Sequence, residues 1–255
     1  MEWIAITGLR VGAFPALRVL APELEVYVTT REGGASPPPF DSLNLGGSLG
    51  DRAGNIRENR RRLLAALGIP RRRLARTGQI HGAEIAAVSA GGVYRGFDGF
   101  VTATRNLTLA ISTADCYSVV IYSPPEKALA AIHVGRRGAE KGIVGRAVDA
   151  LRDRHRVNPA YAIAIIGPGV CGRCYTVSAA DAALFPREAR WREAGVWHLD
   201  LAAVCARELA RRGIPRDHII DAGLCTCCNP PLFFSHRRDR GVTGRHWTLA
   251  TIADP

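Results

Sequence analysis

Lysine is almost missing from this 255-residue chain. Only Lys127 and Lys141 occur, although Lys and Arg together number 34, so the net charge of +11 comes mainly from arginine. The arginines are spread along the chain and form no dense basic tail. Proteins that bind nucleic acid usually cluster their Lys and Arg residues on one face to contact phosphates. The even spread favours a compositional bias, and we expect no nucleic-acid partner.

Long apolar segments and leader-like features are also missing. A run of about eighteen apolar residues would indicate a transmembrane helix, and the sequence has no such run. Residues 1–10 lack a basic segment followed by a long apolar stretch. The seven cysteines are odd in number and unevenly spaced, which suits reduced thiols or metal ligands better than a disulfide framework. We therefore expect a soluble cytoplasmic protein without a membrane partner.

The sequence also lacks linkers and repeats. No stretch rich in Ser, Gly or Pro divides the chain into halves, and no long-period repeat occurs. A chain of 255 residues that is 47% hydrophobic can bury a substantial core. We therefore expect one domain over residues 1–255. Short apolar runs alternate with helical patterns, which is typical of a mixed α and β architecture.

Local patterns predict several individual elements. Short apolar or alternating runs predict strands at 24–30, 107–113, 117–122, 128–132, 162–166 and 218–222. Apolar residues at helical spacing predict helices at 51–68, 143–151 and 200–213. Asp51 and Asp200 are the predicted N-caps, because an Asp side chain can accept hydrogen bonds from the first free N–H groups of a helix.

Three residues at predicted element boundaries have side chains that bind metals. His81 lies in a glycine-flanked turn, Cys116 interrupts two predicted strands, and His133 ends an apolar run. Two imidazoles and a thiolate suit zinc, and three protein ligands leave a fourth position for water or substrate. The residues are too far apart in sequence to match a compact zinc signature. A structural histidine or a core cysteine remains the alternative for each.

Four further cysteines form two C-x-x-C pairs, Cys171 with Cys174 and Cys225 with Cys228. Two pairs of this kind can close a structural zinc site with four thiolate ligands. The alternative is a group of buried, reduced thiols near the active site. The sequence alone leaves both interpretations open.

A series of short motifs runs from Thr29 to Asp239. The motifs are TTREGGAS (29–36), PFDSLNLG (39–46), QIHG (79–82), DGFVT (98–102), TADC (113–116), HVGRRG (133–138), IGPG (166–169), CY (174–175), CT (225–226) and FFSHRRD (233–239). In this order they resemble the YfiH family, which is also called the multicopper polyphenol oxidase (laccase-like) or peptidoglycan editing factor family. The ordered set is far more specific than any one motif.

The resemblance implies an α+β fold, an αβ sandwich in which stacked mixed β-sheets are flanked by helices. It implies a purine nucleoside phosphorylase that also deaminates adenosine and cleaves methylthioadenosine, with purine nucleosides and phosphate as partners. In such an enzyme His81, Cys116 and His133 would hold zinc. The same family is also described as laccase-like with copper, and as an amidase that edits peptidoglycan precursors. A Cys-His amidase and a copper polyphenol oxidase therefore stay open as alternatives.

The catalytic candidates are Asp115 and Cys116. Deamination requires a carboxylate for proton transfer, and Asp115 can do this or can orient a metal ligand. Cys116 is a metal ligand in a zinc enzyme, whereas in an amidase it would be the nucleophile with His133 as its base. Phosphorolysis requires an anion site, and Arg137 lies where a strand is predicted to lead into a helix. The other substrate-binding candidates, all in the quoted motifs, are Arg31, Asn44, Arg237 and Arg238.

The sequence departs from the family pattern at three positions. Arg136 stands where Trp is usual, Ser118 where Pro is common, and His236 where Tyr is common. The loss of the Trp removes an aromatic wall from the expected pocket. We therefore expect a substrate preference that differs from the family norm, with the metal ligands retained.

Overall fold

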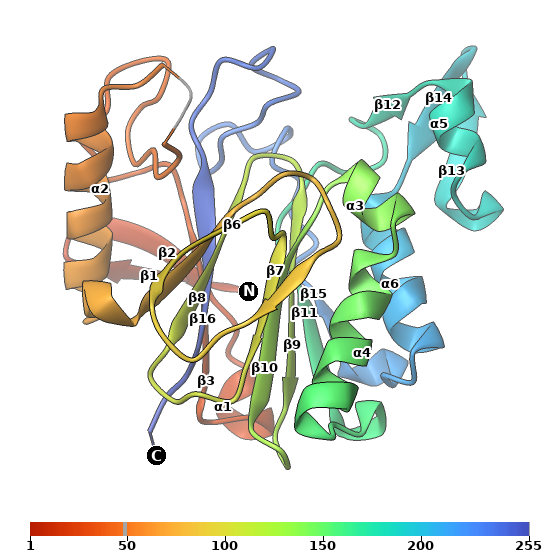
Figure 1. The fold of residues 1–255 in the computed structure, drawn as a ribbon. Coiled ribbons are helices and arrows are strands. Elements are labelled where there is room, and N and C mark those ends of the chain that lie inside the picture. Colours follow the sequence, from red (N-terminus) through yellow and green to blue (C-terminus); the bar gives the residue numbers. More distant parts are fainter. Residues whose placement is uncertain (48–49, 255) are drawn as a thin grey trace.

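Two mixed β-sheets lie face to face at the centre of the structure (Figure 1). The structure is a computed structural model that describes residues 1–47 and 50–254. Within them, one sheet has the strand order β1-β2-β3-β16-β8-β4-β6. Its strands are β1 (Glu2–Ile6), β2 (Leu9–Ala13), β3 (Leu24–Thr29), β4 (Leu74–Gly78), β6 (Gly92–Arg95), β8 (Thr108–Thr113) and β16 (His246–Ile252). We call it the first sheet.

The second sheet has the strand order β15-β11-β9-β10-β7-β5. Its strands are β5 (Ile85–Ala87), β7 (Gly99–Thr102), β9 (Tyr117–Ser123), β10 (Ala128–Val134), β11 (Ile163–Ile166) and β15 (Ile219–Asp221). A small separate sheet has the order β12-β14-β13, with strands β12 (Thr176–Val177), β13 (Arg190–Glu193) and β14 (Val196–Leu199). Both large sheets mix parallel and antiparallel pairs, for example β4 with β8 and β9 with β10.

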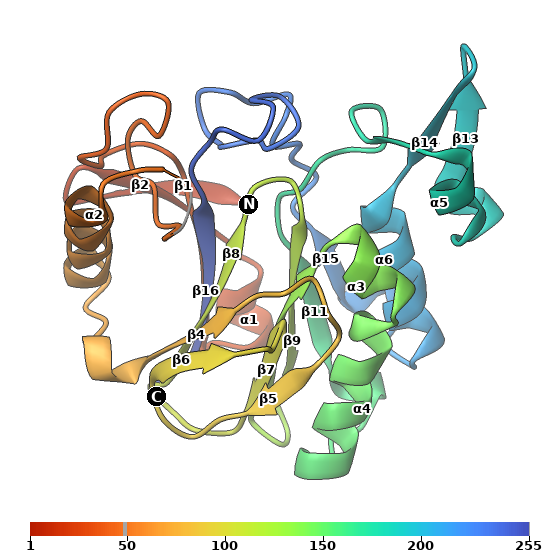
Figure 2. The same ribbon diagram turned by 45° about the horizontal axis from the view of Figure 1, so that its top comes forward.

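Helices cover the outer faces of the two large sheets, as Figures 1 and 2 show. Helix α2 (Ala53–Ala66) lies outside the first sheet, whereas α3 (Arg136–Glu140), α4 (Ile143–His155) and α6 (Leu201–Arg211) lie outside the second. The short helices are α1 (Leu17–Leu20) and α5 (Ala179–Ala183), and single 3-10 turns occur at Arg71–Arg73, Pro159–Tyr161, Arg187–Ala189 and Arg216–His218. Among the described residues, none of the helices is both long enough and apolar enough to cross a membrane.

Strand β9 shows how the layers are built from sequence. All of its residues are buried, because alternate side chains enter two different cores. Val120 and Tyr122 belong to the core between the two sheets, whereas Val119 and Ile121 pack in the core that includes α4 and α6. A strand buried on both faces reads as a continuous apolar run rather than an alternating one. The α+β fold class with stacked mixed sheets and outer helices is confirmed.

Two local predictions need correction. Asp51 is not the N-cap of α2; Arg52 holds that position with extended backbone angles. The Asp51 carboxylate instead accepts hydrogen bonds from Ser36 and Asn44, so tertiary contacts define its role. The predicted strand 128–132 is also too short, because β10 continues through His133 to Val134 by pairing with β9. Asp200 is confirmed as the N-cap of α6 by its bond from the Ala203 N–H group.

Candidate metal centre and its cavity

Three strand ends bring His81, Cys116 and His133 together. Strands β4 and β8 run parallel, so their carboxyl ends lie at the same edge of the first sheet; His81 follows β4 and Cys116 follows β8. Residues 114–116 lead directly into β9 in the second sheet. Strand β10 is antiparallel to β9, and its register places His133 opposite Ser118 near the start of β9. The topology therefore joins residues that are remote in sequence.

The donor atoms of this group are close enough to share one ion. One ligand atom each from His81, Cys116 and His133 lies within 4.8 Å of the others, and the two imidazole rings meet edge to face at 4.8 Å between centroids. The Gly135 backbone closes one side. A Cβ atom at Gly135 would lie 3.0 Å from both the Cys116 Sγ and the His81 Nδ1. Only glycine leaves this space free.

Asp98 orients two of the three ligands. Its carboxylate lies 2.8 Å from the His133 Nδ1 atom and accepts hydrogen bonds from the N–H groups of Ile80, His81 and Gly82. Because Nδ1 bonds to Asp98, the Nε2 atom of His133 is the one available to bind a metal. A carboxylate behind a ligating histidine fixes the ring orientation and raises its basicity. Asp98 is fully buried, and its contacts explain why the turn at His81 has a left-handed φ of 58°.

Cys116 and His133 change each other's proton affinity. Burial raises the pKa of the Cys116 thiol, but the charge of His133 and hydrogen bonds from both histidines outweigh it and lower the pKa to about 6. Burial lowers the pKa of His133, but the charge of Cys116 and the bond to Asp98 raise it to about 9. Without a metal, these opposite shifts favour a thiolate on Cys116 and an imidazolium on His133. A thiolate is also the form of cysteine that binds metal.

Asp115 lines the same cavity as Cys116. Adjacent residues on a regular strand point to opposite faces, but Asp115 has a left-handed φ of 88° and breaks the alternation. Its carboxylate accepts a hydrogen bond of 2.7 Å from the Thr226 hydroxyl and one of 2.5 Å from the Arg237 N–H group. Asp115 is thus a buried, fixed carboxylate beside the candidate metal centre.

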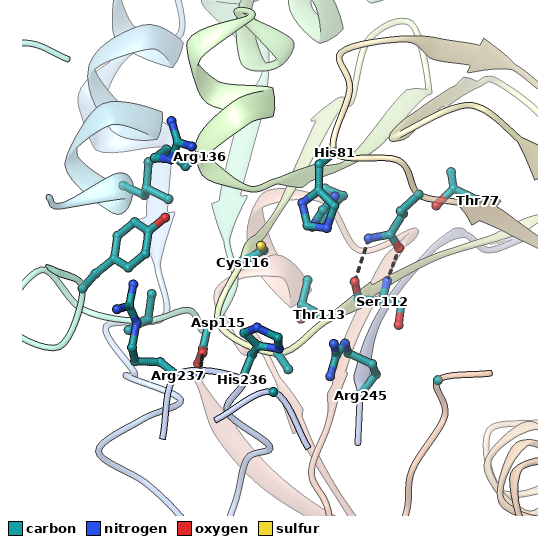
Figure 3. Close-up of a pocket in the computed structure, with 18 of the residues that line it drawn as sticks. Thr77, His81, Ser112, Thr113, Asp115, Cys116, Arg136, His236, Arg237 and Arg245 are labelled. Carbon is teal, nitrogen blue, oxygen red and sulfur yellow. Dashed lines mark hydrogen bonds between the residues drawn. The ribbon is translucent and has the colours of Figure 1, made fainter. Parts of the chain in front are cut away.

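The centre opens into a cavity of about 770 Å³ with a basic lining. Figure 3 shows the Cys116 sulfur and the His81 ring facing the cavity, with Arg237 and Arg245 on different sides of it. Aromatic surface comes from Tyr175 and His236. The arginines that line the cavity are Arg136, Arg237, Arg240 and Arg245. A cavity of this size, with cationic and aromatic walls, suits a small anionic or heterocyclic ligand.

Two of the predicted substrate-binding arginines make structural contacts away from the cavity lining. The Arg31 Nε–H group donates to the Asp41 carbonyl at 2.6 Å, and the guanidinium pairs with the Asp41 carboxylate at 3.1 Å. Arg238 donates to the Phe233 carbonyl at 3.0 Å and pairs with Asp239 at 2.8 Å. Neither side chain lines the cavity, and the contacts of both hold loops around it.

Asn44 and Arg137 also lie outside the cavity lining. Asn44 is fully buried; its amide donates to Asp51 at 2.9 Å, and its Oδ1 atom accepts the Arg245 N–H at 2.9 Å. Asn44 thus positions the backbone of an arginine that does line the cavity. Arg137 is exposed, and its neighbour Arg136 faces the cavity and pairs with an acidic residue of α5. The arginine at the position of the usual Trp is therefore the one at the site.

Sequence reasoning assigned no role to Asp98, Arg245 or Tyr175. Asp98 carried a signal, because an acidic residue directly before the apolar run of β7 must be paired if it is buried. Arg245 carried none: it lies outside the quoted motifs, and only the pairing of β16 with β3 and β8 brings it to the cavity. Tyr175 lies in a motif, but its place beneath the Arg237 guanidinium, 5.1 Å from the ring centroid, depends on tertiary structure.

Fold and site together define an αβ sandwich whose strand ends carry a three-residue group capable of binding metal. A comparison with known proteins identifies a family that matches most of the chain. The family model described as multi-copper polyphenol oxidoreductase laccase matches residues 25–253. The chain belongs to this family.

Several relatives carry another name. The protein named purine nucleoside phosphorylase YlmD, from Geobacillus stearothermophilus, is 36% identical over 255 residues, which cover 93% of this chain and 91% of the relative. The purine nucleoside phosphorylase of Deinococcus radiodurans is 37% identical over 241 residues, covering 92% of each protein. Both names refer to nucleosides as substrates.

Solved structures share the fold over nearly the whole chain. The crystal structure of YlmD from Geobacillus stearothermophilus matches with a TM-score of 0.91 at 31% identity, covering 98% of both chains. The crystal structure of the hypothetical protein YfiH of Bacillus licheniformis matches with a TM-score of 0.87 at 32% identity, covering 91% of this chain and 93% of that one. The extent of the domain over residues 1–255 stays a prediction.

Proposed function

We propose that the protein is a zinc-dependent purine nucleoside phosphorylase that also deaminates adenosine and cleaves methylthioadenosine. The observation that carries the proposal is the His81, Cys116 and His133 group, which faces a basic cavity of about 770 Å³. Relatives of similar length that are named purine nucleoside phosphorylase support the reaction class. The proposal places the enzyme in the reducing cytoplasm, because Cys116 must stay reduced to bind a metal.

The donor set fits zinc. Two imidazoles and a thiolate are ligands that zinc prefers, and three protein ligands leave one position open, as in catalytic zinc sites. The Asp98 carboxylate behind His133 and the space kept free by Gly135 both support a bound ion. Zinc held there would supply Lewis-acid chemistry and make water a better nucleophile near neutral pH.

The chain's own cations fit the phosphate. In phosphorolysis a phosphate oxygen attacks the sugar C1′ atom while negative charge develops on the departing purine. Arg237 and Arg245 face the cavity from different sides, and guanidinium groups bind phosphate oxygens through charge-assisted hydrogen bonds. Of the predicted substrate-binding residues, Arg237 is therefore the best candidate to bind phosphate. Arg245, which was not predicted, is a second candidate. Tyr175 and His236 provide ring surfaces against which a purine can stack.

Asp115 is proposed as the proton-transfer group. Deamination of adenosine adds water at C6 of the purine and releases ammonia, so protons must move from the water to the leaving nitrogen. Asp115 lines the cavity next to Cys116, and two hydrogen bonds hold its carboxylate in place. A fixed carboxylate keeps its oxygen atoms at one distance from the reacting atoms, which is what proton transfer requires.

The test is turnover of adenosine, inosine and methylthioadenosine by zinc-loaded protein, with and without phosphate. We expect release of the free base only when phosphate is present, and formation of inosine from adenosine without phosphate. Cys116→Ala should abolish both reactions, whereas Cys227→Ser, a cysteine outside the centre, should keep them. If the zinc-loaded protein forms neither product, or if Cys116→Ala retains the wild-type rate, the proposal is wrong.

A Cys-His amidase acting on peptidoglycan precursors is the second candidate. The thiolate and imidazolium pair of Cys116 and His133 favours it, because such a pair is the active form of a cysteine nucleophile and its base. Chelation separates the two candidates. A zinc phosphorylase loses activity when its metal is removed and regains it with zinc, whereas a thiol amidase keeps its activity in chelator.

A copper polyphenol oxidase is the third candidate, named by the family description. Four-electron reduction of oxygen needs several copper sites. Over residues 1–47 and 50–254, the cavity contains one three-donor group, and the other group of metal-capable side chains consists of cysteines only. The donor set therefore favours zinc. Elemental analysis of protein purified from cells grown with both metals distinguishes them.

A further inference from the structure

Four cysteine sulfurs converge at a second place in the fold. Strands β11 and β15 are parallel neighbours, so the loops after their carboxyl ends run side by side. A bridge between Gly169 and Cys225 continues this pairing beyond the strands. The Sγ atoms of the two C-x-x-C pairs all lie within 4.8 Å of one another; the four residues are Cys171, Cys174, Cys225 and Cys228.

The spacing fits a single tetrahedral ion. Zinc–sulfur bonds of about 2.3 Å place the sulfurs of a tetrahedral site roughly 3.8 Å apart. The Cys174 and Cys228 sulfurs are 3.4 Å apart, and no pair in the group exceeds 4.8 Å. Disulfide bonds would join the sulfurs in two separate pairs at about 2.05 Å, whereas here both C-x-x-C pairs contribute to one group of free thiols.

Backbone N–H groups already point at one of the sulfurs. The Cys225 Sγ atom accepts hydrogen bonds from the N–H groups of Cys171 at 3.3 Å and of Cys228 at 3.4 Å. Hydrogen bonds to a thiolate stabilise its negative charge and orient its lone pairs, which are the roles that outer contacts have in metal sites. These two bonds also hold Cys171 and Cys228 next to the sulfur of Cys225.

We propose that Cys171, Cys174, Cys225 and Cys228 bind one zinc ion in a closed structural site, separate from the centre at His81. Four thiolates in tetrahedral positions are typical of structural zinc, with no position left for substrate. Cys227 lies between two of the ligands in sequence but is not part of the group. It is the natural control.

The site would fasten two loops that border the cavity. The first loop carries Val170 and Tyr175, which line the cavity, and the second carries Thr226, which donates to Asp115. These loops have little regular secondary structure of their own. A metal that links them stabilises the folded state, because the unfolded chain has no preformed site.

The test measures the number of zinc ions per chain in a variant whose centre at His81 has been removed. We expect His81→Ala/Cys116→Ala protein to retain one zinc ion per chain by elemental analysis. Adding Cys174→Ser/Cys228→Ser should remove it, whereas adding Cys227→Ser should not. Replacement of zinc by cobalt in the His81→Ala/Cys116→Ala protein should give the intense sulfur-to-metal absorption of a tetrahedral thiolate site. Both readouts are independent of nucleoside turnover, so they stand apart from the proposed phosphorylase activity.

Several results would overturn the assignment. These are a His81→Ala/Cys116→Ala protein that is folded by circular dichroism but contains no zinc, iron in place of zinc, or a mass that shows two disulfides. Zinc retained at full stoichiometry after Cys174→Ser/Cys228→Ser would do the same. If the variant with all four substitutions does not fold, the cobalt spectrum of the His81→Ala/Cys116→Ala protein alone decides the question.

Discussion

Gly135→Ala should damage the candidate metal centre while sparing the fold. Gly135 has φ −88° and ψ 170°, angles that alanine adopts without strain. The added Cβ atom, however, would lie 3.0 Å from both the Cys116 Sγ and the His81 Nδ1. A contact this close forces the neighbours to move by a few tenths of an ångström. Metal–ligand distances tolerate changes of only about 0.2 Å, so one ligand must leave its best position.

The expected loss follows from that displacement. Disturbing the groups that position metal ligands typically lowers metal affinity by about 10–100-fold, which corresponds to roughly 1.4–2.7 kcal/mol of binding free energy. The stability of the metal-free protein should change little, since replacing glycine at a compatible position stabilises a protein by about 0.4–1 kcal/mol through the unfolded state. The assay is zinc titration against a competing chelator, with urea unfolding in excess chelator alongside.

Gly54→Ala is the matched control. Gly54 lies in α2, and a Cβ atom there meets only the Arg57 side chain at 4.0 Å. This variant should bind zinc like the wild type. If Gly135→Ala also binds zinc with wild-type affinity, the close approach of its backbone has no role in the centre, and the assignment of these ligands loses its main steric support.

Three further variants test other parts of the site and fold. Asp98→Asn removes the charge behind His133, and zinc affinity measured by chelator competition should fall about 10–100-fold; unchanged affinity would contradict this role. Burial lowers the pKa of His246 to about 3, so as the pH falls below about 6.5 the unfolded chain binds a proton that the folded one does not, and the free energy of unfolding decreases by up to ~1.4 kcal/mol per pH unit. His246→Gln should make that decrease shallower in urea titrations between pH 7 and pH 5, and equal slopes for both proteins would refute the argument. Arg237→Gln should raise the KM for phosphate about tenfold or more, with exposed Arg57→Gln as control; similar KM values for the two would exclude Arg237 from the anion site.

Local pattern predicted the central elements of the fold well. Strands β9 and β10 and helices α4 and α6 were predicted within a few residues of their bounds, because their own apolar residues fill the cores. Strand β6 was not predicted, since three of its four residues are exposed and it depends on pairing with β4. Strand β16 was missed as well. It lies between β3 and β8, and its Trp247 N–H group bonds to Thr29, 218 residues away.

The site shows the same division between local and remote information. His81, Cys116 and His133 were identifiable by residue type, but only the ordered motifs of the family indicated that they act together. Their convergence depends on β4 lying parallel to β8 and on the register of β10 against β9. The spacing of residues along the chain does not predict that strand pairing. Arg245 could not be predicted as a site residue from the sequence, because arginine is common in this chain and the position of Arg245 depends entirely on β16.

Asp115 shows why a local rule fails where several segments meet. Strand alternation predicts that it points away from Cys116, yet three remote groups hold it at a left-handed φ of 88°. Its carbonyl accepts the Val170 N–H at 2.8 Å, while its carboxylate accepts the Thr226 hydroxyl and the Arg237 N–H. Val170 directly precedes one of the clustered cysteines, and Thr226 directly follows another. A zinc ion in that cluster would therefore fix the two loops that hold the proposed proton-transfer group, so that a structural site supports the geometry of a catalytic one.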